Sequence, residues 1–122
     1  MRIPSLLLAK LYVKGTLHNE PNGFRLTLRN VLAPGTAVKL ASFKVDGGER
    51  RLEDVSLVVD GQETLDAAAI SDRTPLFLGL GRELVVRVRG EALAAGAHEI
   101  LLSFVTREVG ELTIPVRDTV GP

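Results

Sequence analysis

The chain has no cysteine and few aromatic residues: four phenylalanines, one tyrosine and no tryptophan among 122 residues. The absence of cysteine excludes disulfide bonds and thiolate metal sites. The scarcity of aromatic rings disfavours single-stranded nucleic-acid binding by base stacking. The apolar run near the N-terminus, Leu6 to Ala9, is too short for a signal sequence or a membrane span. We therefore expect a cytoplasmic protein that does not bind membranes.

Net charge is zero, but the charged residues are unevenly distributed. Residues 1–45 carry seven Lys or Arg and one acid, whereas residues 46–72 carry eight acids and two Arg. Such a balance gives no general signature of nucleic-acid binding. The two segments either neutralise each other across the fold or present faces of opposite sign. Eleven Arg against four Lys favours a thermophilic or GC-rich source.

Alternation of apolar and polar residues dominates the chain and predicts strands. Residues 10–15 and 24–29 both alternate, and the turn-forming sequence "HNEPNG" separates them. Further strands are expected over residues 36–45, 55–59, 74–81, 83–90, 97–106 and 111–120, and short helical turns over 63–70 and 91–95. The pattern predicts one all-β domain over residues 1–122. We expect an antiparallel β-sandwich, immunoglobulin-like or jelly-roll-like, with eight or nine short strands.

The tripeptide Val-Asp-Gly occurs twice, ending in Asp46-Gly47 and in Asp60-Gly61. Asp-Gly is a strong tight-turn signal, because glycine adopts positive φ readily and aspartate bonds to its own backbone. The acids between the two turns are wrongly spaced for a calcium loop, and two arginines interrupt them. We interpret all four residues as structural turn positions.

No sequence motif for catalysis, metal binding or cofactor binding is present. The two histidines are far apart, no nucleophile elbow occurs, and "GLGREL" lacks the features of a phosphate-binding loop. Gly96 and His98 lie in a Leu-x-x-Gly-x-His entry to a strand, where the imidazole is expected to cap or pack. A carboxylate pair for glycoside chemistry stays open, with Glu99 and the Glu53/Asp54 pair as candidates, since only spatial separation decides it. We expect no metal and no cofactor, and an enzyme would need a concave cluster around His98 or Glu99.

A basic surface is the most suggestive feature of the N-terminal third. If residues 10–15 and 24–29 form a hairpin, five side chains share its polar face: Lys10, Tyr12, Lys14, Arg25 and Arg29. Such a face can bind an acidic protein or an anionic ligand, or can simply be solvated.

Residues 43–104 resemble the small β-subunit family of C-glycoside deglycosidases. The shared features are Val45-Asp46-Gly47, Val59-Asp60-Gly61, and Leu93, Gly96 and His98. The resemblance implies a β-sandwich subunit that associates with a larger barrel-fold subunit carrying the metal and the catalytic residues. A hydroxymethylglutaryl-CoA reductase assignment is disfavoured, because such an enzyme needs a longer chain and a nucleotide-binding subdomain, whose motifs are missing.

We therefore expect a non-catalytic interaction or accessory subunit that self-associates or joins a larger enzyme subunit. The alternatives are a sandwich that binds a carbohydrate or an anionic metabolite, and a small enzyme of unknown reaction.

Overall fold

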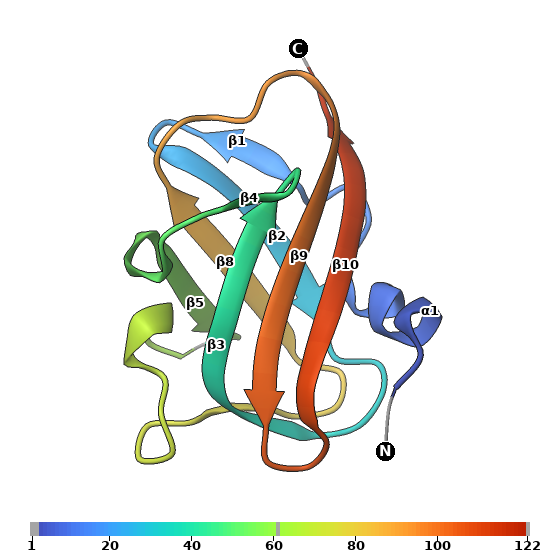
Figure 1. Cartoon of the computed structure of the whole chain (residues 1–122), viewed down its shortest axis with the longest axis vertical. Coiled ribbons are helices and arrows are strands. Elements are labelled where there is room, and N and C mark those ends of the chain that lie inside the picture. The colour runs from blue at the N-terminus through green and yellow to red at the C-terminus, as the bar shows by residue number, and fades with distance from the viewer. Residues whose placement is uncertain (1–2, 61, 122) are drawn as a thin grey trace.

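The computed structural model describes residues 3–60 and 62–121. In it, two antiparallel sheets pack face to face (Figure 1). One sheet has the order β1 (His18–Glu20), β2 (Gly23–Arg29), β8 (Glu83–Arg89), β5 (Val55–Val59) and β6 (Leu65–Asp66). The other has the order β10 (Gly110–Val120), β9 (Gly96–Thr106), β3 (Gly35–Val45) and β4 (Gly48–Glu49), and β7 (Leu76–Leu78) also pairs with β3. The prediction of an all-β antiparallel sandwich is confirmed.

The core lies between the sheets, because alternate residues of each long strand point inward. In β2, Phe24, Leu26 and Leu28 are buried while Arg25 and Arg29 are exposed. Phe24 meets Phe43 of the opposite sheet with ring centroids 6.2 Å apart. Contacts of this kind join the two sheets and make burial of apolar surface the main stabilising contribution.

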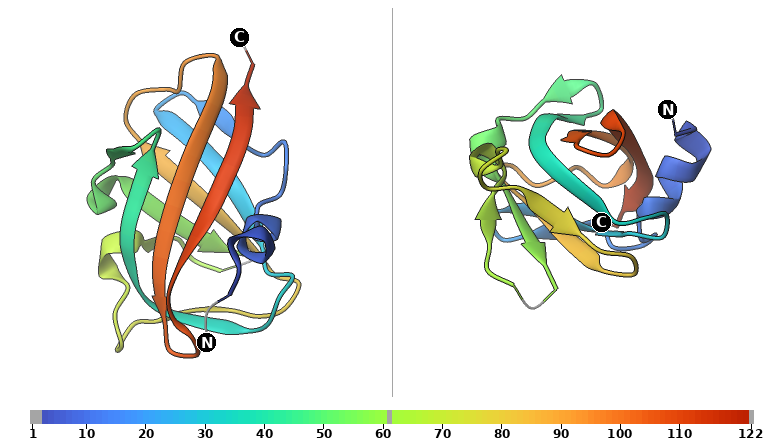
Figure 2. Two further views of the ribbon diagram at one scale, coloured as in Figure 1. Left: turned by 45° about the vertical axis from the view of Figure 1, so that its right-hand side comes forward. Right: turned by 90° about the horizontal axis from the view of Figure 1, so that it is seen from below.

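The N-terminal segment does not form the expected strand over residues 10–15. It forms the short helix α1 (Ser5–Leu8) and a 3₁₀ turn, η1 (Ala9–Leu11), and only Tyr12 makes an isolated bridge to Leu28. α1 lies beside the edge strand β10 (Figure 2), and its residue Leu8 is only 4% exposed. The first strand is β1, which lies in the segment expected to be a turn.

The expected helical turns are also only partly present. Residues 63–70 contain β6 and a 3₁₀ turn, η3 (Ala67–Ala69), whereas residues 91–95 form no helix; a further 3₁₀ turn, η2 (Leu52–Asp54), precedes β5. Alanine-rich segments this short have little helical stability of their own, so tertiary contacts decide their conformation.

Proline and glycine positions agree with the sheet topology. Pro115 lies in β10, an edge strand, where its missing N–H removes no ladder hydrogen bond from a central strand. Gly23 has a φ of 150°, and a Cβ atom there would lie 1.8 Å from the carbonyl oxygen of Val88 in β8. Glycine at this position therefore lets β2 approach β8 closely. None of the helices in the described parts of the chain combines the length and apolarity needed to cross a membrane.

Candidate functional site

The turn between β3 and β4 positions a carboxylate against the start of β9. Asp46 and Gly47 have φ values of 50° and 86°, so both turn residues are in the left-handed region, and Val45 pairs with Gly48. This conformation lets the Asp46 N–H donate to the Glu99 carbonyl oxygen at 2.7 Å. The Glu99 N–H in turn donates to the Asp46 carboxylate at 2.8 Å. The turn is thus fixed to the neighbouring strand by two hydrogen bonds.

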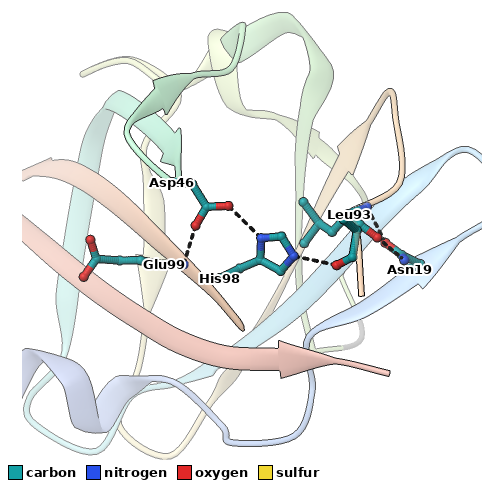
Figure 3. A network of polar contacts seen from close by, with 6 residues as sticks. Asn19, Asp46, Leu93, His98 and Glu99 are labelled. Atoms are coloured by element: carbon teal, nitrogen blue, oxygen red, sulfur yellow. Dashed lines mark hydrogen bonds and ion pairs between the residues drawn. The ribbon is translucent and has the colours of Figure 1, made fainter. Parts of the chain in front are cut away.

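His98 joins this carboxylate to the loop before β9 (Figure 3). Its Nδ1 lies 2.7 Å from the Asp46 carboxylate, and its Nε2 lies 2.6 Å from the carbonyl oxygen of Ala94. Neither acceptor can donate, so both ring nitrogens must carry a proton for both bonds to form. The Ala94 carbonyl and then Asp46 accordingly raise the pKa of His98, while the Glu99 N–H and then His98 lower the pKa of Asp46.

The loop that His98 holds is also attached to β1. The side-chain amide of Asn19 donates to the Leu93 carbonyl oxygen and accepts from the Leu93 N–H, both at 2.8 Å (Figure 3). The residues of the Leu-x-x-Gly-x-His sequence are therefore in one network: Leu93 is bonded to β1, Gly96 begins β9 with a φ of 120°, and His98 is bonded to the Asp46 turn.

A hollow of about 540 Å³ lies beside His98, as an enzyme would require. It is lined by Lys14, Asp46, Ala97, His98, Glu99, Arg117, Asp118 and Thr119. Its acids are already paired: Glu99 accepts from Arg117 at 2.8 Å, and Asp118 accepts from the Tyr12 hydroxyl at 2.6 Å and from the Gly15 N–H at 2.8 Å. The Tyr12 hydrogen bond lowers the pKa of Asp118, and burial followed by this hydrogen bond raises the pKa of Tyr12.

This arrangement engages both ring nitrogens of His98 in hydrogen bonds within the fold. A catalytic histidine needs one ring nitrogen available to the reacting group, and here Nε2 is committed to a backbone carbonyl. Glu53 and Asp54 line one hollow and Glu99 lines another, so the structure separates Glu99 from the other two carboxylates. Across the described residues, no cluster of three or more His, Cys, Asp or Glu side chains has an arrangement able to hold a metal ion.

The five residues of the expected basic face do not form one face of a hairpin, because residues 10–15 form no strand. Lys10 is in η1, and Lys14 is in a turn and lines the hollow beside His98. Tyr12 packs against the core and reaches across to β10. Only Arg25 and Arg29 share an exposed face, on β2.

The acidic segment forms ion pairs with later arginines and not with the basic N-terminal residues. Asp54 pairs with Arg89 at 3.2 Å, Asp60 with Arg82 at 4.0 Å and Asp72 with Arg107 at 3.6 Å. Among the described ion pairs, none joins residues 46–72 to Lys10, Lys14, Arg25 or Arg29. Within the described residues, direct ion pairs therefore join the acids of this segment to Arg51 and to later arginines. Gly61, expected with Asp60 in a turn, lies outside the described residues.

Exposed apolar side chains gather beside β7, at the end of the sandwich opposite the His98 loop. Val31, Phe77 and Leu80 are 48%, 59% and 60% exposed. Their segments are neighbours, since the Gly81 N–H donates to the Asn30 carbonyl oxygen at 2.7 Å, and a Cβ at Gly79 would lie 3.5 Å from the Phe77 ring. We call Val31, Phe77 and Leu80 the apolar patch. The run "PLFLGLG" indicates the apolar patch in the sequence, because a strand there is apolar on both faces. Such a pattern is typical of a strand whose outer face is covered.

Comparison with known proteins places the chain differently from the resemblance stated above. Residues 7–121 match the family model for the hydroxymethylglutaryl-CoA reductase N-terminal domain. No curated protein gives a significant match. The assignment to the C-glycoside deglycosidase β-subunit family is therefore wrong. The rejection of the hydroxymethylglutaryl-CoA reductase family is wrong as well. The quoted tripeptides are turn signals that unrelated sandwiches share. The match is to a domain described as N-terminal in the reductase, and it covers residues 7–121 of this chain.

Proposed function

The chain belongs to the hydroxymethylglutaryl-CoA reductase N-terminal domain family, and we propose that it acts as a non-catalytic accessory domain through protein–protein contact. The observation that carries the proposal is the apolar patch, which consists of three large exposed side chains on adjoining segments. Isolated exposed apolar residues are ordinary, but several large ones on adjoining segments are typical of a surface that another protein covers. The occupant we propose is the remainder of a reductase of this family.

The edge position of β7 supports the same surface. In the described structure β7 pairs only with β3, through Leu76 to Leu78, so its other side offers backbone hydrogen-bonding groups to a partner. Phe77 is the centre of this edge, and aromatic side chains contribute strongly to protein interfaces.

The test is binding to the catalytic part of a family reductase, measured by titration calorimetry, with light scattering to detect self-association. The Phe77→Ser and Leu80→Ser double variant should weaken binding about a hundredfold, as expected for loss of two central apolar contacts. Leu6→Ser is the matched control, because Leu6 is 80% exposed on α1 and lies outside the patch. A monomer that binds no reductase would count against the proposal. If the wild type self-associates and the double variant does not, the partner of this surface is a second copy of the chain and not a reductase.

A carbohydrate- or anion-binding role is the second proposal, and it now depends on Arg25 and Arg29. Both are exposed on β2, and neither makes an ion pair among the described contacts. Sugar phosphates should then raise the midpoint of thermal unfolding of the wild type, and the Arg25→Ala, Arg29→Ala double variant should lose that rise. No rise with any anion would remove this proposal.

A further inference from the structure

An apolar cavity of about 170 Å³ lies between the two sheets, beneath α1 and the loop that joins β2 to β3. Both sheets and the helix contribute to its wall, including Leu8, Leu28, Ala37, Leu76, Leu84 and Ile114. Each of these side chains is at most 8% exposed. The cavity is therefore a partly open space walled by buried core side chains, and the exposed residues Ala33, Pro34 and Glu108 also border it.

Polar groups around the cavity are already bonded within the protein. The Asn30 side-chain amide donates to the carbonyl oxygens of Ala33 and Leu78, at 2.7 and 2.9 Å, and its oxygen accepts from the N–H of Leu32 at 3.1 Å. The Thr106 hydroxyl donates to the Gly110 carbonyl oxygen at 2.9 Å. A ligand inside would thus find no free donor or acceptor on these two side chains.

The charged residues at the cavity do not select a charged ligand. Arg29 and Glu108 both line it and are of opposite sign. Glu108 accepts the Thr36 N–H at 2.8 Å, and Arg29 lies directly across from Glu83 in the register of β2 and β8. The local charges are therefore balanced, and an ionic headgroup would gain little.

From this wall and this volume we infer that the cavity binds a small uncharged hydrocarbon group, aliphatic or aromatic, of about the size of benzene. Water is unfavourable in an apolar cavity, and an apolar cavity of roughly 150 Å³ in another protein stays dry and binds benzene. The same physical reasoning applies here, since a hydrocarbon restores the dispersion contacts that an empty space lacks. This site is separate from the apolar patch and does not depend on the proposed partner.

The experiment uses the wild-type chain with benzene as the probe and methyl-resolved NMR as the measurement. Nuclear Overhauser effects should join benzene protons to the methyl groups of Leu28, Leu84 and Ile114. The midpoint of thermal unfolding should rise with benzene concentration and then level off, because the ligand binds the native state. Cyclohexane should behave similarly, whereas inositol, its hydroxylated analogue, should give neither effect.

Ala37→Leu places a larger side chain in the cavity and should weaken benzene binding about tenfold or more, since the space is then occupied. Ala95→Leu is the matched control, because Ala95 is exposed on the loop before β9 at the other end of the sandwich. If Ala37→Leu does not fold, Ala33→Phe at the rim serves instead. The inference would be overturned if a folded variant with the cavity filled bound benzene as tightly as the wild type. It would also be overturned if benzene gave Overhauser effects to Phe77 and Leu80 alone.

Discussion

Stability should depend on pH through His98, and the direction follows from its two hydrogen bonds. The side chain is 10% exposed and bonds at both ring nitrogens, one to a carboxylate and one to a carbonyl. Folding therefore favours the protonated ring, and the pKa of His98 is raised in the native state. A group with a raised native pKa stabilises fully below its unfolded pKa, about 6.5, and loses this contribution as pH rises through the native value.

The carboxylate of Asp46, the partner of His98, determines the lowest pH at which the pair stabilises the fold. The pKa of Asp46 is lowered, by the Glu99 N–H first and by His98 second. A carboxylate of this kind stabilises above its unfolded pKa, about 3.9, and the stabilisation is lost as pH falls through the native value. The network should therefore contribute most between about pH 4 and 6.5.

The perturbation is His98→Ala, which removes both hydrogen bonds. Hydrogen bonds to charged groups contribute about 1.5–3 kcal/mol each, but Asp46 is half exposed and water screens its share. We expect His98→Ala to lower the free energy of unfolding by about 2 kcal/mol near pH 5.5, and by less near pH 9. Urea titrations followed by far-ultraviolet circular dichroism measure both values, since the chain has no tryptophan.

His18→Ala is the control, because it removes an exposed imidazole on β1 and leaves the Asp46 turn intact. A second measurement is the ¹⁵N spectrum of the imidazole, in which both nitrogens of His98 should be protonated at pH values where an ordinary histidine is neutral. Parallel pH profiles for wild type and His98→Ala, or a His98 ring that titrates below ordinary histidine, would refute the reasoning.

Two further substitutions test the packing that supports this arrangement. Gly23→Ala should lower the free energy of unfolding by about 3 kcal/mol in urea titrations, because its Cβ would meet the Val88 carbonyl oxygen. Gly110→Ala is the control, since Gly110 has a positive φ but open space around it, and it should cost only about 1 kcal/mol. Equal losses in the two variants would contradict the steric explanation. Asn30→Ala should lower the free energy of unfolding by about 3 kcal/mol, because it leaves buried backbone groups without hydrogen bonds. Asn30→Asp should recover part of that loss at acidic pH, where a protonated carboxyl group can donate. A loss in Asn30→Asp that does not change with pH would contradict this explanation.

Local patterns were sufficient to predict the sheets. Apolar residues that recur at every second position must face one side of an extended strand, so the burial of Leu26 and Leu28 follows from spacing alone. The same logic applies to the Asp46-Gly47 turn, since few residues other than Gly, Asn and Asp accept positive φ.

Local patterns failed where a segment fits two conformations. Residues 10–15 alternate as a strand would, yet their first two residues belong to the 3₁₀ turn that continues α1, whose Leu8 is buried. Strand preference is a weak local signal, and tertiary contacts decide such a segment. The basic face was predicted from that strand, so its five residues were assigned a common surface that the fold does not provide.

The sequence by itself determined an antiparallel sandwich, because periodicity and turn chemistry are properties of neighbouring residues. Only the tertiary structure decided that His98 meets Asp46, that Asp54, Asp60 and Asp72 pair with later arginines, and that a cavity remains beneath α1. These features join residues that are distant in the chain. Their distances depend on strand order and on how the core fills, which spacing along one chain does not specify.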